Sequence, residues 1–215
     1  MAAGASNDLP LDHGESLGEV EIQGLGEPKD LVDMRWVTPG YFDALGAHLL
    51  AGRSFNEHDM KNVTAAVIVN EAFVAAYLRG HNPLRAEVRS GSKASISSRS
   101  WASVIGVIGN IKHSTLEEKP HPEYFQPYRR NFDAWNLHFA VRSKLPAQVI
   151  ISAAREALRR LDSALLLDDV RTMEERVAEA NARRRFQMVL LSTFAAIAFF
   201  LAMIGIYGVM AYTVR

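Results

Sequence analysis

Cysteine is absent from the 215 residues, which excludes disulfide bonds and thiolate metal sites. A phosphate-binding loop of the type GxxxxGKS or GxxxxGKT is also absent, so we expect the chain itself to bind no nucleotide cofactor. Excess charge is missing as well, because 24 basic residues balance 24 acidic ones. Without a net positive field the chain has no long-range attraction for phosphate backbones, and we expect no nucleic-acid partner.

The N-terminus lacks the basic stretch and the following apolar stretch of a signal peptide, and it contains no long apolar run. Polar residues, glycine and proline interrupt every regular period over residues 1–30. We therefore expect residues 1–30 to form an irregular lead-in to the folded part of the chain.

One long apolar run stands at the other end of the chain. Residues 186–214 contain no charged side chain between Arg185 and Arg215. A helix of about 20 apolar residues crosses roughly 30 Å of hydrocarbon, and the polar residues of this run gather toward its two ends. We expect a transmembrane helix in contact with the lipid bilayer. The alternative is the central helix of a soluble core, but the residues before it would form too small a body to surround it.

Small residues recur along one face of this expected helix. Ala195, Ala198, Ala202 and Gly205 are spaced at steps of three and four, so they form a stripe that another helix backbone could approach closely. We expect this stripe to pack against a partner helix. The alternative is that alanine is simply common in membrane helices.

Apolar patterns predict several short elements between residues 31 and 128. Thr38 is expected to cap a short helix that ends at Gly46, and Asn70 to cap a second helix over residues 71–79. The expected strands cover residues 31–37, 48–50, 65–69, 101–111 and 123–128. The small and polar residues 90–100 are expected to form a mobile loop within a hairpin.

A strand, a helix and a strand are predicted in succession over residues 134–170. Alternation over 134–141 indicates the first strand, Pro146 can open the amphipathic helix, and the apolar run 165–170 indicates the second strand. Residues 31–50 show a shorter version of the same unit. The fold class that we expect is therefore α+β, built of βαβ units with mixed sheets.

A capping box marks the start of the last helix. The hydroxyl of Thr172 and the carboxylate of Glu175 are spaced so that each can accept from the other's backbone amide. Neither proline nor glycine follows until Gly205, so we expect one unbroken helix from residue 173 through the membrane, some 40 residues and about 60 Å long. Residues 172–185 would form a stalk outside the bilayer.

Four stretches of the sequence, taken in order, resemble a known family. The stretches are VTPGYFDALGAHLLAGRSFNEHD at 37–59, AVIVNEAFVAAYL at 66–78, VIGVIGNIKHSTLEEKPHPEYFQPY at 104–128 and RRRFQMVLLSTFAAIAFFLAMIGIYGVMAYTVR at 183–215. They resemble the MacB-type periplasmic core domain followed by the opening helix of an FtsX-like permease domain. The resemblance implies a MacB-like periplasmic core domain over residues 31–171, a stalk helix over 172–185 and a membrane helix over 186–214.

This resemblance implies the permease subunit of an ABC transporter that transmits ATPase-driven motion to substrate outside the membrane. The implied partners are an ABC ATPase subunit or domain, which binds the ATP, a second permease copy in a dimer, and further permease helices. The implied location is the bacterial inner membrane, with the globular domain on the periplasmic or extracellular side. Members of the family have a membrane helix before this domain and three more after it, so we expect the chain to be a fragment.

The charges beside the apolar run support a different topology. Arg183, Arg184 and Arg185 precede it directly, and the positive-inside tendency alone would keep them in the cytoplasm. The chain would then be a tail-anchored cytoplasmic adaptor or binding domain. We favour the orientation implied by the resemblance, because a fair count of charges needs the residues on both sides of the run.

Candidate catalytic groups are few, and we expect the chain not to be an enzyme. Residues 52–56 resemble a nucleophile elbow around Ser54, but Asn56 replaces the second glycine. His58 and Asp59 could act as an acid–base pair, although a polar loop explains them more simply. A second group of histidine and acidic residues lies over residues 113–123, and we call it the second histidine group. Its members are His113, His121, Glu117, Glu118 and Glu123. These residue types could bind a metal, but solvated turn residues are the simpler explanation.

Overall fold

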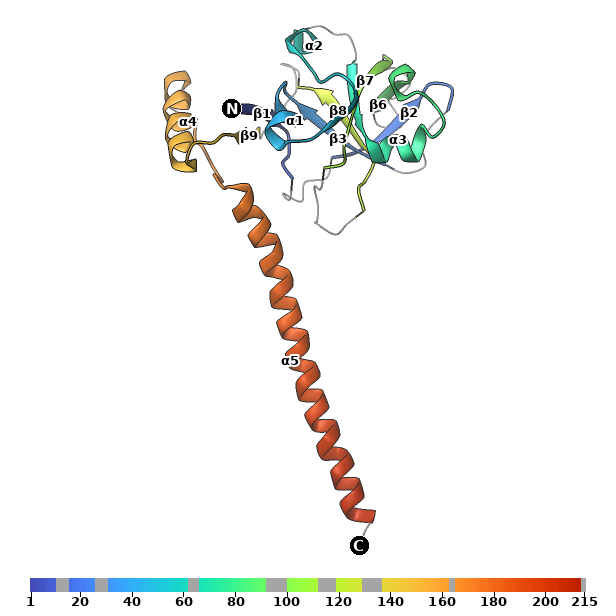
Figure 1. The fold of residues 1–215 in the computed structure, drawn as a ribbon, viewed down its shortest axis with the longest axis vertical. Coiled ribbons are helices and arrows are strands. Elements are labelled where there is room, and N and C mark those ends of the chain that lie inside the picture. Colours follow the sequence, from blue (N-terminus) through green and yellow to red (C-terminus); the bar gives the residue numbers. More distant parts are fainter. Residues whose placement is uncertain are drawn as a thin grey trace. The chain divides into compact units, whose positions relative to one another are not determined.

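The computed structural model describes residues 1–10, 16–25, 31–61, 66–91, 100–111, 119–128, 137–162 and 165–213. The chain divides into two compact units, Met1–Ile150 and Ile151–Arg215. Figure 1 shows the strands and short helices of the first unit, which we call the body, and the long helix α5 of the second unit. Strands and helices are mixed along the chain, which confirms the expected α+β class.

Among its described residues, the body contains nine strands and four short helical segments. The strands are β1 Ala2–Ser6, β2 Leu17–Ile22, β3 Val32–Val37, β4 Leu49–Gly52, β5 Ala66–Asn70, β6 Glu87–Gly91, β7 Ala102–Ile108, β8 Glu123–Pro127 and β9 His138–Arg142. The helical segments are α1 Tyr41–Leu45, α2 Glu57–Lys61, α3 Glu71–Tyr77 and the 3-10 turn η1 Pro83–Arg85. Helix α4, Ala147–Leu161, crosses the boundary between the units, and α5 covers Met173–Thr213.

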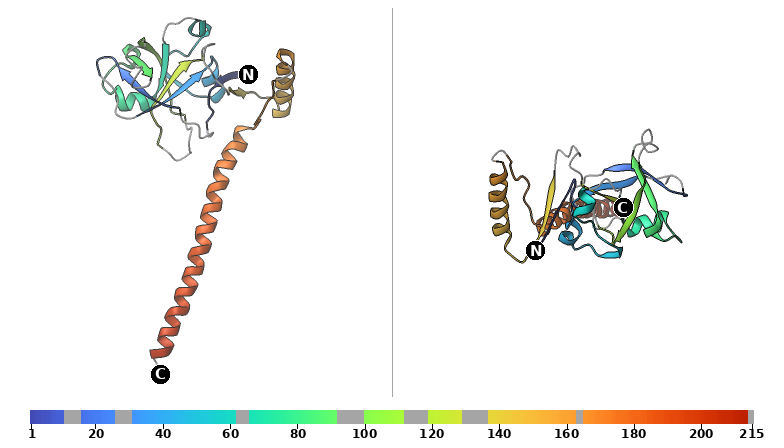
Figure 2. Two further views of the ribbon diagram at one scale, coloured as in Figure 1. Left: turned by 180° about the vertical axis from the view of Figure 1, so that it is seen from behind. Right: turned by 90° about the horizontal axis from the view of Figure 1, so that it is seen from above.

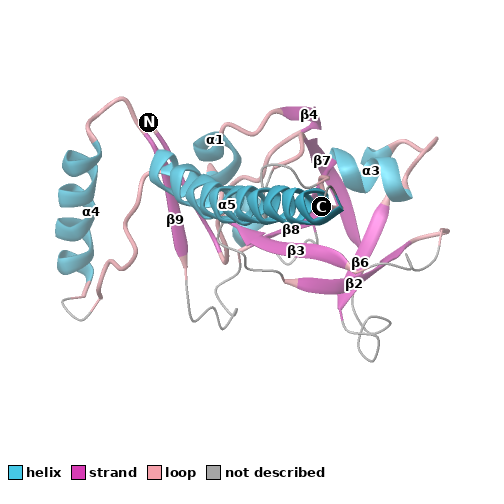
Figure 3. Ribbon diagram, turned by 90° about the horizontal axis from the view of Figure 1, so that it is seen from below, coloured by secondary structure: helices cyan, strands magenta, loops and turns pink. Residues whose placement is uncertain are grey.

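Six strands of the body form a closed ring. The strand order is β2-β6-β7-β5-β8-β3-β1-β9, and an additional pairing of β2 with β3 closes the first six strands on themselves. Strand β3 runs parallel to β8 and β5 runs parallel to β7, whereas the other pairs are antiparallel. Figure 3 shows β2, β3 and β6 of this ring. The sheet is therefore mixed, as expected.

Two apolar clusters lie on the two faces of the ring strands. The first cluster takes buried residues from all six ring strands and from Phe73 and Leu78, at and just after α3. The second takes Ile68 and Phe125 from the same strands, together with Phe42 of α1 and Phe55. Alternate residues of β5 enter different clusters, because side chains alternate across a strand. Both faces of the central strands are thus covered, which explains why all five residues of β5 are buried.

The expectation of an irregular lead-in over residues 1–30 is wrong for its described part. Strand β1 pairs with β9 from Ala2 to Ser6, and β2 pairs with β6 and β3. Backbone contact replaces side-chain packing here: a Cβ on Gly4 would overlap the backbone of Tyr41, and a Cβ on Gly40 would overlap the carbonyl of Ala3. The small residues that hide the strand in the sequence are what let it lie so close to α1.

Residues 165–170, for which a strand is predicted, contain none. None of the described strands pairs with this segment, and Leu166 is 88% exposed. Thr38 does not cap α1 either, because its hydroxyl accepts from the amide of Ala5 at 2.7 Å while Gly40 occupies the cap position. Two other caps form as expected. Gly46 ends α1 with a φ of 72°, and Asn70 Oδ1 accepts from the amide of Phe73 at 2.8 Å.

The second unit is dominated by one continuous helix. Helix α5 runs for 41 residues without a break, as the unbroken pattern of the sequence predicts, and Figure 2 shows it from two further sides. At 1.5 Å per residue its length is about 60 Å. The loop predicted over residues 90–100 lies mostly outside the described residues, as does the start of the strand predicted over 134–141.

Candidate functional site

The apolar part of α5 is long enough to span a membrane. Residues Gln187–Ile206 have a mean hydropathy of 2.5, and none of that stretch is buried inside the structure. Large apolar side chains point outward all round it, among them Phe199 at 63% exposure and Ile204 at 67%. Two of its polar side chains are satisfied locally, since the hydroxyls of Ser192 and Thr193 donate to the carbonyl of Val189 at 2.9 and 2.8 Å. The helix can therefore enter hydrocarbon without an unpaired hydroxyl at these positions.

The stripe of small residues lies within this stretch and is open. Ala195, Ala198, Ala202 and Gly205 are all exposed, and a Cβ added to Gly205 would meet nothing within 4 Å. The packing of the stripe against a partner helix stays a prediction.

The first turn of α5 carries the two hydrogen bonds of a capping box. The amide of Thr172 donates to Glu175 Oε2 at 2.8 Å, and the amide of Glu175 donates to Thr172 Oγ1 at 3.2 Å. Because the first amides of a helix have no partner within the helix, this pair stabilises its start. The α5 helix therefore begins at a defined residue.

Ion pairs fix the residues just before α5 onto its first turns, and we call this group the stalk clasp. It comprises Asp169, Arg171, Arg176 and Glu179. Asp169 accepts from Arg171 at 2.5 Å and from Arg176 at 2.9 Å, and Arg171 also reaches Glu179 at 2.5 Å. Asp169 has a φ of 46°, in the left-handed region that non-glycine residues seldom occupy. The sequence analysis did not predict this group. The alternation of acidic and basic residues around the start of the predicted helix could have indicated ion pairs there.

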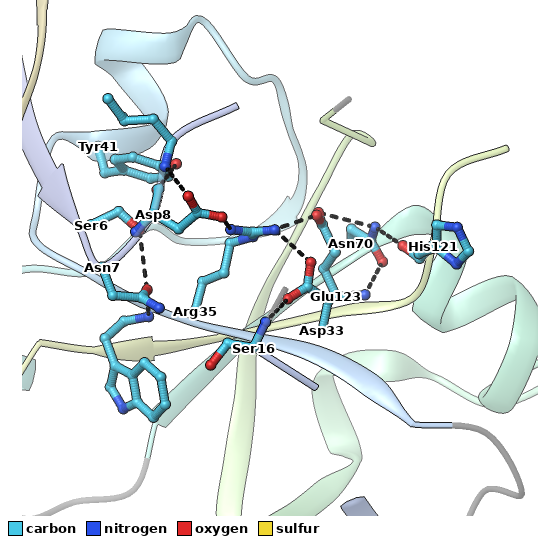
Figure 4. Close-up of polar contacts among 12 residues, drawn as sticks. Ser6, Asn7, Asp8, Ser16, Asp33, Arg35, Tyr41, Asn70, His121 and Glu123 are labelled. Atoms are coloured by element: carbon cyan, nitrogen blue, oxygen red, sulfur yellow. Dashed lines mark hydrogen bonds and ion pairs between the residues drawn. The ribbon is translucent and has the colours of Figure 1, made fainter. Parts of the chain in front are cut away.

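A second group of charges, which we call the buried ion network, lies inside the body. Arg35 of β3 is its centre, with a side chain that is 1% exposed. The guanidinium donates to Asp8 and to Asp33, each at 2.5 Å, and its Nε lies 3.8 Å from Glu123 Oε1 (Figure 4). Tyr41 of α1 donates its hydroxyl to the carbonyl of Asp8 at 3.4 Å. The network thus joins the segment after β1 to β3 and β8.

Asn70 connects the same network to α3. Its side-chain amide donates to the carbonyl of His121 at 2.7 Å and to Glu123 Oε2 at 3.3 Å. Its Oδ1 accepts from the amide of Glu123 at 3.0 Å, in addition to the cap bond to Phe73. One side chain therefore ends β5, starts α3 and holds the first residue of β8, as Figure 4 shows in part.

Burial dominates the electrostatics of the buried ion network. Removal from water raises the pKa of Glu123 to about 8, and the neighbouring charge of Asp33 adds to that rise, while Arg35 opposes it. Burial likewise raises the pKa of the Tyr41 hydroxyl. Burial would lower the pKa of Arg35, but its three carboxylate neighbours outweigh this effect and raise it. These shifts favour the charged form of Arg35 and the neutral form of Glu123.

The sequence pattern predicts a strand over residues 31–37, which contains Asp33 and Arg35, but it does not predict that these two side chains are buried. The structure buries both of them, because Asp8 and Glu123 supply partners from segments far away in sequence. No short motif contains these four residues. A signal was nevertheless present, since charged residues interrupt the apolar strands 31–37 and 123–128 at positions that face the same side.

The catalytic candidates around residue 54 have structural roles in the described residues. Asp59 pairs with Arg53 through both carboxylate oxygens, at 2.6 and 2.9 Å, and also accepts from the amide of Asn56 at 2.9 Å. The hydrogen bond from Arg53 lowers the pKa of Asp59, which suits a fixed anion better than an acid–base group. Asn56 Oδ1 in turn accepts from the amides of His58 and Asp59, so it starts helix α2.

The second histidine group is only partly described. His113, Glu117 and Glu118 lie outside the described residues, His121 contributes its carbonyl to Asn70, and Glu123 belongs to the buried ion network. Over the described ranges, no three His, Asp or Glu side chains come together as a metal site would require. The absence of catalysis stays an expectation.

Comparison of the sequence with protein-family models gave no match, and comparison with curated proteins gave none. Among solved structures, the chain is similar to the periplasmic region of MacB from Actinobacillus actinomycetemcomitans, with a TM-score of 0.53, 18% sequence identity and coverage of 75% of this chain and 67% of that one. It is also similar to the extracellular domain of the noncanonic ABC-type transporter YknZ from Gram-positive bacteria, with a TM-score of 0.49, 18% identity and coverage of 75% and 74%. The chain therefore has the fold of the MacB periplasmic region, followed by one long apolar helix.

Proposed function

We propose that this chain is the extracytoplasmic body, the stalk and the first following membrane helix of an ABC-transporter permease. The observation that carries the proposal is the continuity of α5, which is one helix from its capped start at Met173 through the apolar stretch that ends at Ile206. The fold of the MacB periplasmic region supports the assignment of the body. The sequence resemblance to the MacB and FtsX type of permease supplies the transporter class.

In this proposal the stalk transmits motion rather than substrate. An α-helix resists stretching and bending because every backbone group within it is hydrogen-bonded to the next turn. ATP hydrolysis by a separate ATPase would move the membrane end of α5, and the stalk would carry that displacement to its capped end at Thr172. The proposed partners are that ATPase, a second permease copy, and neighbouring permease helices in the bilayer.

A break in the stalk tests this proposal. Four glycines inserted between Ala180 and Asn181 of the complete permease should interrupt the helix, whereas four alanines at the same place add about 1.1 turns and keep it helical. Because the chain has no cysteine, a single dye can be placed on Lys144→Cys, an exposed position of the body. With the ATPase bound in nanodiscs, ATP should change the dye signal in the parent and in the alanine variant.

The glycine variant should keep its ATPase rate and lose the ATP-dependent dye signal. An undiminished signal in the glycine variant would show that motion does not pass along a rigid stalk. Loss of the signal in both variants would show that the length of the stalk, and not its continuity, decides coupling, and would also contradict the proposal.

The same labelled variant tests the location of the body. We propose that the body lies on the periplasmic or extracellular side of the bacterial inner membrane. A membrane-impermeant maleimide should then react with Lys144→Cys in cells whose inner membrane is intact. Reaction only after the inner membrane is opened would favour the tail-anchored cytoplasmic adaptor, the topology that the three arginines before the apolar run favour.

A further inference from the structure

The four side chains of the stalk clasp form one linear series of ion pairs. Arg176 binds one carboxylate oxygen of Asp169 at 2.9 Å, and Arg171 binds the other oxygen at 2.5 Å through its Nε. Arg171 continues the series to Glu179, at 2.5 Å, through its Nη1. Asp169 and Arg171 therefore bind two partners each, so the loss of either side chain breaks two of these three contacts.

The stalk clasp holds a part of the chain that the capping box does not reach. The capping box joins Thr172 to Glu175 and so fixes the residue directly before α5. The ion pairs begin at Asp169, three residues earlier, and end on the first two turns of the helix. The segment in front of α5 is thus attached to the side of the helix as well as to its end.

Backbone strain at Asp169 opposes these ion pairs. Its φ of 46° lies in the left-handed region, which is unfavourable for a residue with a side chain, although aspartate tolerates it better than most. The opposing ion pairs are weakened by water, because the side chains of Asp169 and Arg171 are each 44% exposed. A small unfavourable contribution and a small favourable one therefore act on the same residue.

We propose that the stalk clasp is a joint with two states. In the closed state, which the structure shows, the ion pairs hold Asp169 in the left-handed conformation and fix residues 169–179 as one rigid piece. In the open state the ion pairs are broken, Asp169 returns to a negative φ, and the segment before α5 moves independently of the helix. The closed joint passes a displacement of α5 to that segment, and the open joint does not. This last step rests on the proposed function of the stalk, whereas the two states do not.

A pair of spin labels on the two sides of the joint tests for the two states. Because the chain has no cysteine, the labels can be placed on Leu166→Cys, which is 88% exposed before the clasp, and on Met188→Cys, which is 53% exposed on α5. Double electron–electron resonance on the full chain in nanodiscs should give a narrower distance distribution in dilute salt than at about 1 M NaCl, where charges are screened beyond about 3 Å.

Two variants separate the ion pairs from other causes. Asp169→Asn keeps the shape of the side chain and its tolerance of a positive φ but removes the charge, so its distribution should be broad in dilute salt and independent of salt. Arg160→Gln is the control, because it breaks the exposed pair with Glu156 on α4 and should behave as the parent. A parental distribution that salt does not change would overturn the proposal. A distribution in Asp169→Asn as narrow as the parental one would overturn it too, since the backbone alone would then set the bend.

The dye assay on Lys144→Cys tests the role of the joint in the complete permease. Asp169→Asn should keep its ATPase rate and lose most of the ATP-dependent dye signal, whereas Arg160→Gln should keep both. A parental dye signal in Asp169→Asn would overturn the coupling role of the joint, even where the glycine insertion abolishes the signal. An undiminished signal in the glycine variant would instead contradict the proposed function of the stalk, and the spin-label result on the two states would still stand.

Discussion

The strand β5 and the apolar stretch of α5 are similar in composition and opposite in environment. All five residues of β5 are buried in the body, and its four apolar residues belong to the two apolar clusters. The stretch Gln187–Ile206 is entirely exposed. The difference teaches that the body completes its own core, whereas α5 requires an apolar solvent or another protein around it. Changes in the two regions should therefore be detected by different measurements, folding for the body and insertion or assembly for α5.

The largest effect on the body is expected from removal of its buried cation. Arg35→Met should lower the free energy of unfolding by about 3–5 kcal/mol, because it leaves buried carboxylates without their partner. Urea denaturation measures this loss. Arg53→Met is the control, since the Arg53 side chain is 49% exposed and its pair with Asp59 should contribute less than about 1 kcal/mol. Equal losses of unfolding free energy in the two variants would mean that the buried ion network contributes no more to stability than the exposed pair.

The largest effect on α5 is expected from a charge at the centre of its apolar stretch. Phe199→Arg should oppose membrane insertion by about 3 kcal/mol, while Phe199→Leu should insert as the parent does. Resistance of the chain to alkaline extraction from membranes measures insertion. Folding of the body should be unchanged in both variants, because Phe199 is 63% exposed and outside both apolar clusters. A folding defect in Phe199→Arg would contradict the division between the two regions.

A smaller effect is expected from the stripe of small residues. Ala198→Leu and Ala202→Leu should weaken association between membrane helices by about 1 kcal/mol, since larger side chains keep the backbones apart. Cross-linking in a bilayer at graded protein-to-lipid ratios measures association. Ile197→Leu keeps the side-chain volume at the neighbouring position and should leave association unchanged. If all three variants associate like the parent, the stripe does not meet a partner helix.

The smallest effect is expected at the start of the stalk. Thr172→Ala removes the hydroxyl that accepts from the amide of Glu175, which should cost about 1 kcal/mol of local helix stability. Amide hydrogen exchange over residues 173–176 should become faster. Thr172→Ser retains the hydroxyl and should exchange at nearly the parental rate. Exchange that is equally slow in Thr172→Ala would show that the ion pairs of the stalk clasp suffice to hold the first turn.

Local signals in the sequence predicted the elements that local physics decides. Asn70 caps α3, Gly46 ends α1, and the apolar period of the last residues produces one continuous helix. Each of these features depends on a few adjacent residues and on backbone hydrogen bonds within one segment. The mixed sheet and the MacB type of fold could be predicted too, because the resemblance supplied the long-range order that periodicity lacks.

Features that depend on distant partners could not be predicted in this way. Strand β1 exists because β9 pairs with it, although its own residues have low strand propensity. Residues 165–170 have the composition of a strand and no partner, so they remain irregular. Arg35 pairs with residues up to 88 positions away in the sequence, and only the folded chain brings them together.

The close approach of Gly4 and Tyr41 has a consequence for how this molecule tolerates change. Where two segments of one chain touch through their backbones alone, the contact does not depend on the hydrophobicity or charge of the side chains. It leaves no room for an added atom. Strand β1, which lies between β3 and β9, can therefore change in chemistry at its exposed position Ala3, whereas an alanine at residue 4 would push it off α1 and loosen the neighbouring Asp8 from Arg35. A single methyl group at the first strand would thus reach the centre of the body.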